Sequence, residues 1–314
     1  MSKIILIVMK IFLSNLNESW IIDRMKEEFS NYNPDIVTDD IKESDIIWII
    51  APWMWKKIPK KYLKSKTVVC SVHHLEEKDY SGKPLKEFYK RDKFVDFYHT
   101  ISEKSKIEIQ KLTSKNIVSI PFWINENIFF PIEEKSSLRL KYNLNEDSFI
   151  IGSFQRDTEG KDLKSAKLIK GPDRFVEIVK FFALKNDNLI VLLTGYRRQY
   201  VIKRLEEENI QYKYIEMVDF ENLNELYNCL DLYIVSSRVE GGPQAILECG
   251  ITKTPIISTD VGVASEVLAS ESIFNMDNYE DAKPNIEVAL KNSIKYSREN
   301  GMSKYVKMFE EVFK

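Results

Sequence analysis

Short runs of apolar, mostly β-branched residues recur along the chain and are separated by stretches with helical periodicity. One such stretch, residues 172–182, places Phe175, Val176, Val179 and Phe182 at the spacing of one helix face. Continuous apolar strands that alternate with helices are typical of parallel sheets covered on both faces. The pattern therefore predicts an α/β chain of Rossmann-like type. The runs are residues 4–8, 46–50, 67–72, 94–99, 116–120, 149–152, 189–193, 212–216, 232–235 and 255–258.

These runs divide into two sets of five, and the break between them lies in residues 121–147. A chain of 314 residues is long enough for two domains. We therefore expect an N-terminal domain of residues 1–130 and a C-terminal domain of residues 131–300. The last segment, about 300–314, predicts an amphipathic helix that could pack back on the N-terminal domain.

The charge is nearly balanced, with 46 basic and 48 acidic residues and a formal net charge of -2. Domains that bind nucleic acid are usually basic, so this balance argues against a nucleic-acid partner. The three cysteines, Cys70, Cys229 and Cys249, form no C-x-x-C motif. Their odd number disfavours a disulfide framework or a zinc ribbon and fits a reducing cytosol.

The sequence contains no pattern typical of a targeting or membrane-spanning segment. The apolar run of residues 4–13 is interrupted by Lys10 and lacks a small-residue cleavage site, so we do not expect a signal peptide. Nothing approaches the ~18 uninterrupted apolar residues of a membrane-spanning helix. These features predict a cytoplasmic protein.

Residues 51–66 contain six lysines and no acidic residue, with Trp53, Trp55 and Tyr62 among them. This segment has two interpretations. It could form a peripheral contact with the anionic inner face of a membrane, which would suit a lipid-linked acceptor. Alternatively, it is a solvated basic loop whose tryptophans pack on the domain or line an acceptor cleft.

The most informative stretch is residues 231–266, where an apolar strand at 232–235 is followed by Glu240-Gly241-Gly242-Pro243 and a helix to about Cys249. Proline fits the first turn of a helix, and the two glycines let backbone N–H groups approach a ligand closely. The positive end of the helix favours an anion. Ligands of open α/β sheets bind outside the carboxyl ends of the strands, so we expect a phosphate site at this turn.

Glu240 and Glu248 are eight positions apart on either side of this helix start. A carboxylate so close to a phosphate would be repelled unless it had another partner. Acidic residues bind ribose hydroxyls in dinucleotide folds. We therefore expect the two glutamates to bind two polyols on either side of a diphosphate.

Residues 240–268, EGGPQAILECGITKTPIISTDVGVASEVL, closely resemble the E-x7-E signature of family 4 glycosyltransferases of the GT-B fold, as does the preceding NCLDLYIVSS at 228–237. Residues 120–132 are similar to the segment that joins the two domains in that family, and residues 99–112 are similar to the strand and helix just before it. The resemblance implies two Rossmann-like domains facing a cleft, with the acceptor on the N-terminal side. It also implies a nucleoside-diphosphate (NDP) sugar as co-substrate, retention of anomeric configuration, and neither a cofactor nor a metal.

The resemblance also implies roles for donor-side residues. Glu240 would hold hydroxyls of the donor sugar beside Gly241, Gly242 and Pro243, and Glu248 would hold the ribose. Arg156 and Lys170 match the family's pair of cations that stabilise the diphosphate. The family usually has only a few residues between these cations, whereas residues 157–169 intervene here, with Lys161, Lys164 and Lys167 as rivals to Lys170.

Two further positions complete the predicted site. His73 and His74 follow the strand at 67–72, where the family commonly has a histidine that positions the reacting sugar. Met217 and Val218 follow the strand at 212–216, where backbone groups would read the nucleotide base. Many family members carry a glycine-rich turn after the first strand, but this chain has FLSNLNE at residues 12–18.

The sequence therefore predicts a retaining, metal-independent glycosyltransferase of the hexosyl type. It would move a sugar from an NDP-sugar to the hydroxyl of a glycan or lipid-linked acceptor, in surface glycan or glycolipid biosynthesis. The alternative is a non-catalytic subunit of a glycan assembly complex that binds the sugar nucleotide without transferring the sugar.

Overall fold

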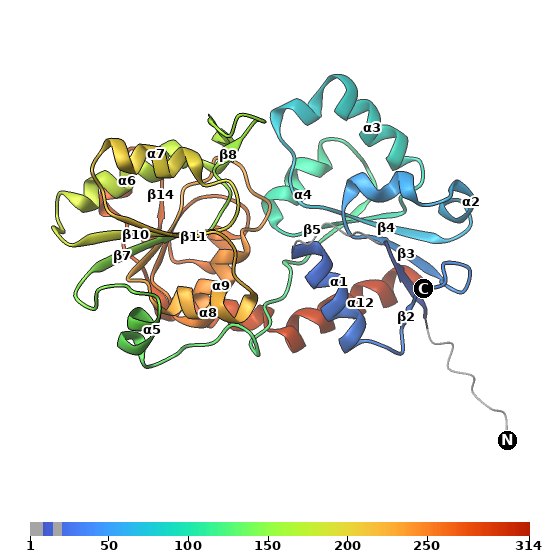
Figure 1. Cartoon of the computed structure of the whole chain (residues 1–314). Coiled ribbons are helices and arrows are strands. Elements are labelled where there is room, and N and C mark those ends of the chain that lie inside the picture. Colours follow the sequence, from blue (N-terminus) through green and yellow to red (C-terminus); the bar gives the residue numbers. More distant parts are fainter. Residues whose placement is uncertain (1–8, 15–20) are drawn as a thin grey trace. The chain divides into compact units, whose positions relative to one another are not determined.

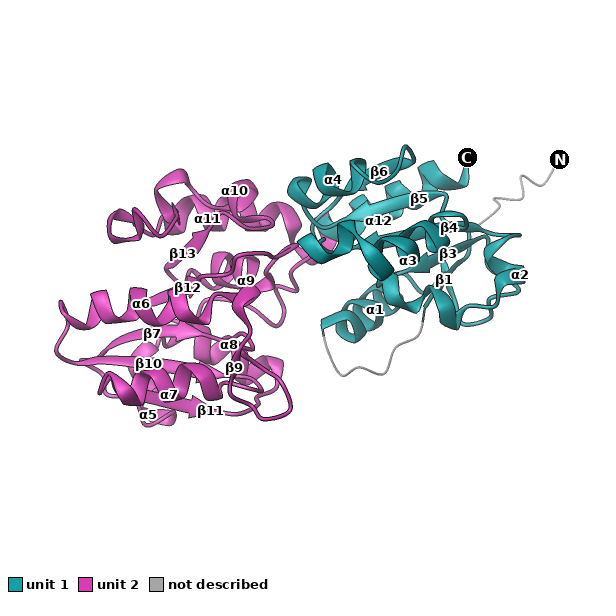
Figure 2. Ribbon diagram, turned by 90° about the horizontal axis from the view of Figure 1, so that it is seen from above, with its two compact units in different colours: residues 1–122, 301–314 teal, residues 123–300 magenta. Residues whose placement is uncertain are grey.

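A computed structural model describes residues 9–14 and 21–314. The chain divides into two compact units (Figure 2), the first formed by Met1–Phe122 with Gly301–Lys314 and the second by Trp123–Asn300. The division falls between Phe122 and Trp123, eight residues before the boundary expected after residue 130.

Unit 1 contains a six-stranded sheet with the order β2-β1-β3-β4-β5-β6, in which every pair is parallel. The strands are β1 (Ile11–Leu13), β2 (Val37–Thr38), β3 (Ile46–Ile49), β4 (Thr67–Val72), β5 (Phe97–Thr100) and β6 (Asn116–Ser119). The helices are α1 (Ile21–Tyr32), η1 (Pro52–Lys57), α2 (Lys60–Leu63), η2 (Glu77–Tyr80), α3 (Gly82–Asp92), α4 (Glu103–Gln110) and most of α12 (Arg298–Phe313).

The C-terminal helix α12 packs on the same face of this sheet as α1 (Figure 1). The indole of Trp48 in β3 lies 5.2 Å from the ring of Phe29 in α1 and 5.4 and 5.2 Å from Tyr305 and Phe309 in α12. All four side chains are fully buried. Large aromatic rings in such contacts remove much apolar surface from water, which fixes α12 to unit 1.

Two details of unit 1 differ from the sequence prediction. Phe12 and Leu13, expected in a turn after the first strand, lie in β1, because Ile11 and Leu13 extend the apolar pattern into the sheet between β2 and β3. The expected strand at residues 94–99 begins only at Phe97. The predicted strand at residues 4–8 and the rest of the expected turn, residues 15–18, lie outside the described residues.

Unit 2 contains a second parallel six-stranded sheet, with the order β11-β10-β7-β12-β13-β14. The chain runs outward from β7 in both directions, so β7 and β12 flank the point where the strand order reverses. The strands are β7 (Phe149–Ser153), β10 (Leu189–Thr194), β11 (Tyr212–Ile215), β12 (Leu232–Val235), β13 (Ile256–Thr259) and β14 (Ile273–Phe274), with a separate antiparallel pair, β8 (Thr158–Glu159) and β9 (Ser165–Ala166).

Helices cover both faces of this sheet, as the apolar strands predict (Figure 1). In β7, Ile150 packs in the cluster on the side of α8 and α9, whereas Ile151 packs in the cluster on the side of α6 and α7. The helices are α5 (Lys135–Lys141), η3 (Leu168–Lys170), α6 (Pro172–Ala183), α7 (Gln199–Glu207), α8 (Phe220–Asn228), α9 (Gln244–Thr252), α10 (Ala264–Val267), η4 (Ser270–Ser272), η5 (Tyr279–Asp281), α11 (Ile286–Ser293) and η6 (Ile294–Tyr296). No helix among the described residues is both long and apolar enough to cross a bilayer.

Candidate functional site

The candidate site of unit 2 lies at the carboxyl ends of β7 and β12, where the segment after β12 is joined to the segment that enters α6. The backbone N–H groups of Arg238 and Val239 donate to the carbonyl of Ile169 at 2.8 and 3.2 Å. The Ser236 hydroxyl donates to the carbonyl of Gly171 at 2.8 Å. These bonds bring residues distant in sequence together at the place where an open α/β sheet binds ligands.

Gly171 allows this close approach. Its φ is +61°, in the left-handed region, and an added Cβ would lie 1.9 Å from the carbonyl oxygen of Ser236. Any other residue would therefore separate the two segments. Gly171 directly precedes Pro172, the first residue of α6, so the same position also starts that helix.

Lys170 and Glu240 form an ion pair at this junction. The Lys170 ammonium donates to Oε1 of Glu240, and the two side chains are 21% and 10% exposed. The Ser237 hydroxyl also donates to Glu240 Oε1 at 3.2 Å, and the Gln155 amide donates to the Lys170 carbonyl at 3.0 Å. The sequence predicted that Lys170 would bind the diphosphate of a donor and Glu240 its sugar hydroxyls. The structure brings these two side chains together.

Arg156 and Lys167 lie near this pair. Arg156 follows β7, is half-buried, and its Nε donates to the Thr158 carbonyl at 3.0 Å. Residues 157–169, which lengthen the chain between Arg156 and Lys170, form the β8–β9 hairpin, with Lys167 at its base. Burial lowers the pKa of Lys167, and the positive charges of Lys170 and Arg156 lower it further. Three cations therefore share this end of β7.

A buried ion pair, which the sequence analysis did not predict, anchors the base of the hairpin. Nε of Arg198 donates to Oδ2 of Asp157 at 2.6 Å, and both side chains are almost completely buried. The same guanidinium donates to the carbonyls of Ser153 and Thr194, at the ends of β7 and β10. No local pattern predicts this pair, because adjacent basic residues such as Arg197-Arg198 are usually solvated.

The EGGP turn leads into α9, which begins at Gln244 and ends at Thr252. Pro243 is therefore the cap residue before the helix, not a residue of its first turn, and the helix extends beyond the expected end at Cys249. Gly262, with φ +51°, lies against this turn: an added Cβ would be 2.5 Å from the Gly241 carbonyl oxygen. The loop after β13 thus supports the backbone of the EGGP turn.

Replacing Gly262 by alanine is expected to lower the free energy of unfolding by about 2–4 kcal/mol, from overlap with the backbone of the EGGP turn and the unfavourable φ. Gly82→Ala is the matched control, because Gly82 has a similar φ of +59° and its added Cβ would meet no atom within 4 Å. Urea unfolding of both variants tests this. Equal losses in the two variants would show that the close contact does not matter.

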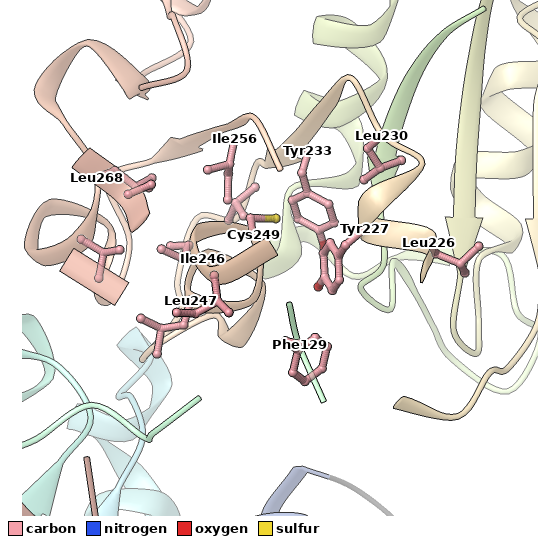
Figure 3. Packing of buried hydrophobic residues seen from close by; sticks show 14 of the residues in the cluster. Phe129, Leu226, Tyr227, Leu230, Tyr233, Ile246, Leu247, Cys249, Ile256 and Leu268 are labelled. Carbon is pink, nitrogen blue, oxygen red and sulfur yellow. The ribbon is translucent and has the colours of Figure 1, made fainter. Parts of the chain in front are cut away.

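Glu248 is inside α9 and only 5% exposed. The Tyr227 hydroxyl, from α8, donates to Glu248 Oε2 at 2.8 Å. Tyr227 packs on Tyr233, with ring centroids 5.4 Å apart, in the apolar cluster of Figure 3. Burial raises the pKa of Tyr227 well above its usual range, and the Glu248 carboxylate adds to the shift. Tyr227 is a functional candidate that the sequence analysis did not identify.

Met217 and Val218 follow β11, an edge strand that β10 separates from β7. They share the carboxyl edge of the sheet with the Lys170–Glu240 pair but have no described contact with it. Met217 is 51% exposed, whereas Val218 packs against the apolar cluster. Their backbone is therefore placed along the same edge, farther from the EGGP turn.

In unit 1, His73 and His74 follow β4 and have different surroundings. Nε2 of His73 lies 3.0 Å from the Ile50 carbonyl and must donate to it, since a carbonyl only accepts. Burial lowers the pKa of His73 to about 4, so the imidazole is neutral at pH 7. His74 is one-third exposed and lies 3.7 Å from Glu76. His99 is fully buried. Its Nδ1 lies 2.8 Å from the Ser71 hydroxyl, and its Nε2 lies 2.8 Å from the Ile120 carbonyl.

The basic segment 51–66 runs from one end of the sheet of unit 1 to the other. Trp53, in η1 directly after β3, is 51% exposed at the carboxyl end. Trp55 is buried and packs on Phe94. The Lys66 ammonium donates to the Lys42 carbonyl at 2.9 Å, beyond the amino end of β3. Membrane contact through this segment stays a prediction.

Among the residues that the structure describes, no group of three or more His, Cys, Asp or Glu side chains could hold a metal ion. The junction around Lys170 holds three cations, Arg156, Lys167 and Lys170, beside the Glu240 carboxylate. Such a site can bind a multiply charged anion through its cations and hydroxyl groups through its carboxylate.

A protein-family model described as "Glycosyl transferases group 1" matches residues 139–307 of the chain. A search of curated proteins found no match. Among solved structures, Anabaena HepE in complex with UDP and glucose has a TM-score of 0.74 and 13% sequence identity, over 96% of this chain and 100% of that one.

Two further solved structures are similar to the chain. A glycosyltransferase from Rickettsia africae has a TM-score of 0.67 and 17% identity, over 96% of this chain and 84% of that one. A sucrose-phosphate synthase from Thermosynechococcus elongatus has a TM-score of 0.69 and 14% identity, over 95% and 80%. These similarities confirm the predicted fold class of two Rossmann-like domains, as in GT-B proteins.

Proposed function

Because the chain belongs to the glycosyl transferases group 1 family, we propose that it is a retaining, metal-independent glycosyltransferase of the family 4 type. It moves a hexose-type sugar from an NDP-sugar to an acceptor hydroxyl, in the biosynthesis of a surface glycan or glycolipid. We propose a cytoplasmic location, with any membrane contact peripheral. The observation that carries the proposal is the Lys170–Glu240 pair beside the EGGP turn, at the point where the strand order of unit 2 reverses.

The cations of unit 2 are suited to a nucleoside diphosphate. A departing diphosphate carries about two to three negative charges, which fixed cations and a helix N-terminus can stabilise as a metal ion would. Arg156 and Lys170 supply two positive charges, Lys167 lies close to both, and α9 begins directly after the EGGP turn. We therefore assign the diphosphate to this junction.

The two glutamates are assigned to the hydroxyl groups on either side of the diphosphate. Glu240 forms an ion pair with Lys170, so a donor phosphate would share the ammonium and leave the carboxylate to the sugar hydroxyls. Glu248 would bind the ribose, and the Tyr227 hydroxyl holds its carboxylate in place. Backbone groups of Met217 and Val218 would read the base.

Retention requires that the acceptor add to the face of the sugar from which the diphosphate departs. In the proposed step, the bond from the anomeric carbon to the phosphate oxygen breaks and the acceptor oxygen bonds to that carbon. The acceptor proton passes to the departing phosphate. His73 is neutral and can hydrogen-bond the reacting sugar; His74 is the alternative.

A thermal-shift panel of UDP, GDP, ADP, CMP and their common sugar conjugates, with and without EDTA, tests the donor assignment. HepE was solved with UDP and UDP-glucose, so UDP is the first candidate. A ligand at 100 times its Kd should add about 2.7 kcal/mol of stability. We expect one nucleoside diphosphate to raise Tm selectively and EDTA to leave that shift unchanged. No shift with any nucleotide would contradict the proposed donor site.

A further inference from the structure

We propose that Trp53 is a stacking platform for a pyranose ring of the acceptor, which makes the acceptor a carbohydrate or a glycosylated lipid recognised by its sugar. This inference rests on the proposed function. Trp53 lies in η1, directly beyond the carboxyl end of β3. The strand order of unit 1 reverses between β1 and β3, and ligands of such sheets bind outside the carboxyl ends at that reversal.

Trp53 is exposed although the next residue in the chain is buried and hydrogen-bonded within unit 1. Its indole is 51% exposed, although the neighbouring Met54 and Trp55 are buried. The Ser14 hydroxyl donates to the Met54 sulfur at 3.3 Å and accepts from the Ile50 backbone N–H at 3.3 Å. The residue next to Trp53 is therefore held in unit 1 while about half of the Trp53 surface stays exposed, and a site fixed in this way needs little reorganisation on binding.

His73 joins Trp53 at the same place. The two rings are perpendicular, with centroids 6.0 Å apart, and the Nε2–H of His73 is fixed on the Ile50 carbonyl. The other imidazole nitrogen, Nδ1, is then the acceptor of the neutral ring. The face of an indole is electron-rich and attracts the weakly positive C–H groups of a sugar ring. An aromatic face beside a hydrogen-bond acceptor suits a ring that carries both C–H groups and hydroxyls.

Two of the six lysines of residues 51–66 are engaged by other groups of unit 1, which disfavours a membrane as the partner of Trp53. A membrane-binding patch needs its aromatic rings and its cations at one level. Lys56 forms an ion pair with Glu87 of α3, and the Lys66 ammonium is bonded at the amino end of the sheet, away from Trp53. Of the described tryptophans, Trp48, Trp55 and Trp123 are buried and cannot insert beside it.

Trp53→Ala, with Tyr89→Ala as the matched exposed aromatic of unit 1, tests the proposal. Transfer from the NDP-sugar found by the thermal-shift panel is measured to octyl glycosides of glucose, galactose, mannose and N-acetylglucosamine. We expect Trp53→Ala to raise the acceptor KM about tenfold, as for loss of an aromatic contact. Hydrolysis of the donor by water and the Kd of the nucleoside diphosphate should stay within about twofold, and Tyr89→Ala should change nothing.

Two further measurements, glycoside binding followed by fluorescence and binding to vesicles, distinguish sugar stacking from membrane contact. Fluorescence of the wild type and of Trp53→Ala is titrated with the same glycosides; no change that depends on Trp53, or an unchanged KM, overturns the proposal. Binding to phosphatidylcholine vesicles with and without phosphatidylglycerol should be equal for both proteins, and a loss confined to Trp53→Ala would show a membrane contact instead. A wild type that binds no nucleotide would contradict the proposed function itself.

Discussion

Glu240→Gln is expected to lower kcat for sugar transfer at least about 100-fold while the protein still binds the nucleoside diphosphate. In the proposed mechanism the carboxylate holds donor hydroxyls most strongly in the transition state, and an amide accepts hydrogen bonds more weakly. The substitution also releases Lys170 from its ion pair. Affinity for the diphosphate alone, measured by calorimetry, should therefore stay equal or increase.

Lys170→Met is expected to change binding in the opposite direction. Loss of the ammonium removes a charge-assisted contact to phosphate, so Kd for the nucleoside diphosphate should rise about 10–100-fold. The matched controls are Lys141→Met for Lys170→Met and Glu225→Gln for Glu240→Gln, each of which breaks the Lys141–Glu225 ion pair elsewhere in unit 2. Normal transfer by Glu240→Gln would reject the role of Glu240, whereas nucleotide binding by a wild type that transfers no sugar would favour the non-catalytic alternative.

Asp157→Asn is expected to lower the free energy of unfolding of unit 2 by about 3–5 kcal/mol, because Arg198 would remain charged and buried without its partner. Urea unfolding followed by circular dichroism measures the change. The double variant Asp157→Asn/Arg198→Met should recover part of the loss, since it no longer buries an unpaired charge.

The control for Asp157→Asn is Glu207→Gln, which removes an exposed pair with Arg204 and should cost less than about 1 kcal/mol. Asp157→Asn should also weaken nucleotide binding. The Asp157 carbonyl accepts a hydrogen bond from the Lys167 backbone N–H at the base of the hairpin, and this bond holds the loop on which Arg156 lies. A stability loss no larger than that of the control would mean that the buried pair does not anchor this loop.

The sequence by itself determined the architecture and the position of the EGGP turn. Strand and helix patterns depend on the spacing of apolar residues within one segment, so β4 and β12 occupy the predicted ranges 67–72 and 232–235. The glycines and the proline before α9 are equally local signals, although the helix begins one residue later than expected. Where the signal was mixed, as at Phe12 and Leu13, the prediction was wrong because pairing between strands outweighed the local pattern.

Only the tertiary structure decided which charged groups meet. Lys161, Lys164, Lys167 and Lys170 are alike in sequence, but folding of the β8–β9 hairpin leaves Lys170 against Glu240, 70 residues away. The Asp157–Arg198 pair joins residues 41 apart, and the segment 51–66 is spread along a sheet rather than gathered in one patch. Such contacts depend on the order of the strands in the sheet and on which charged side chains become buried. Neither can be read from the residues of one segment.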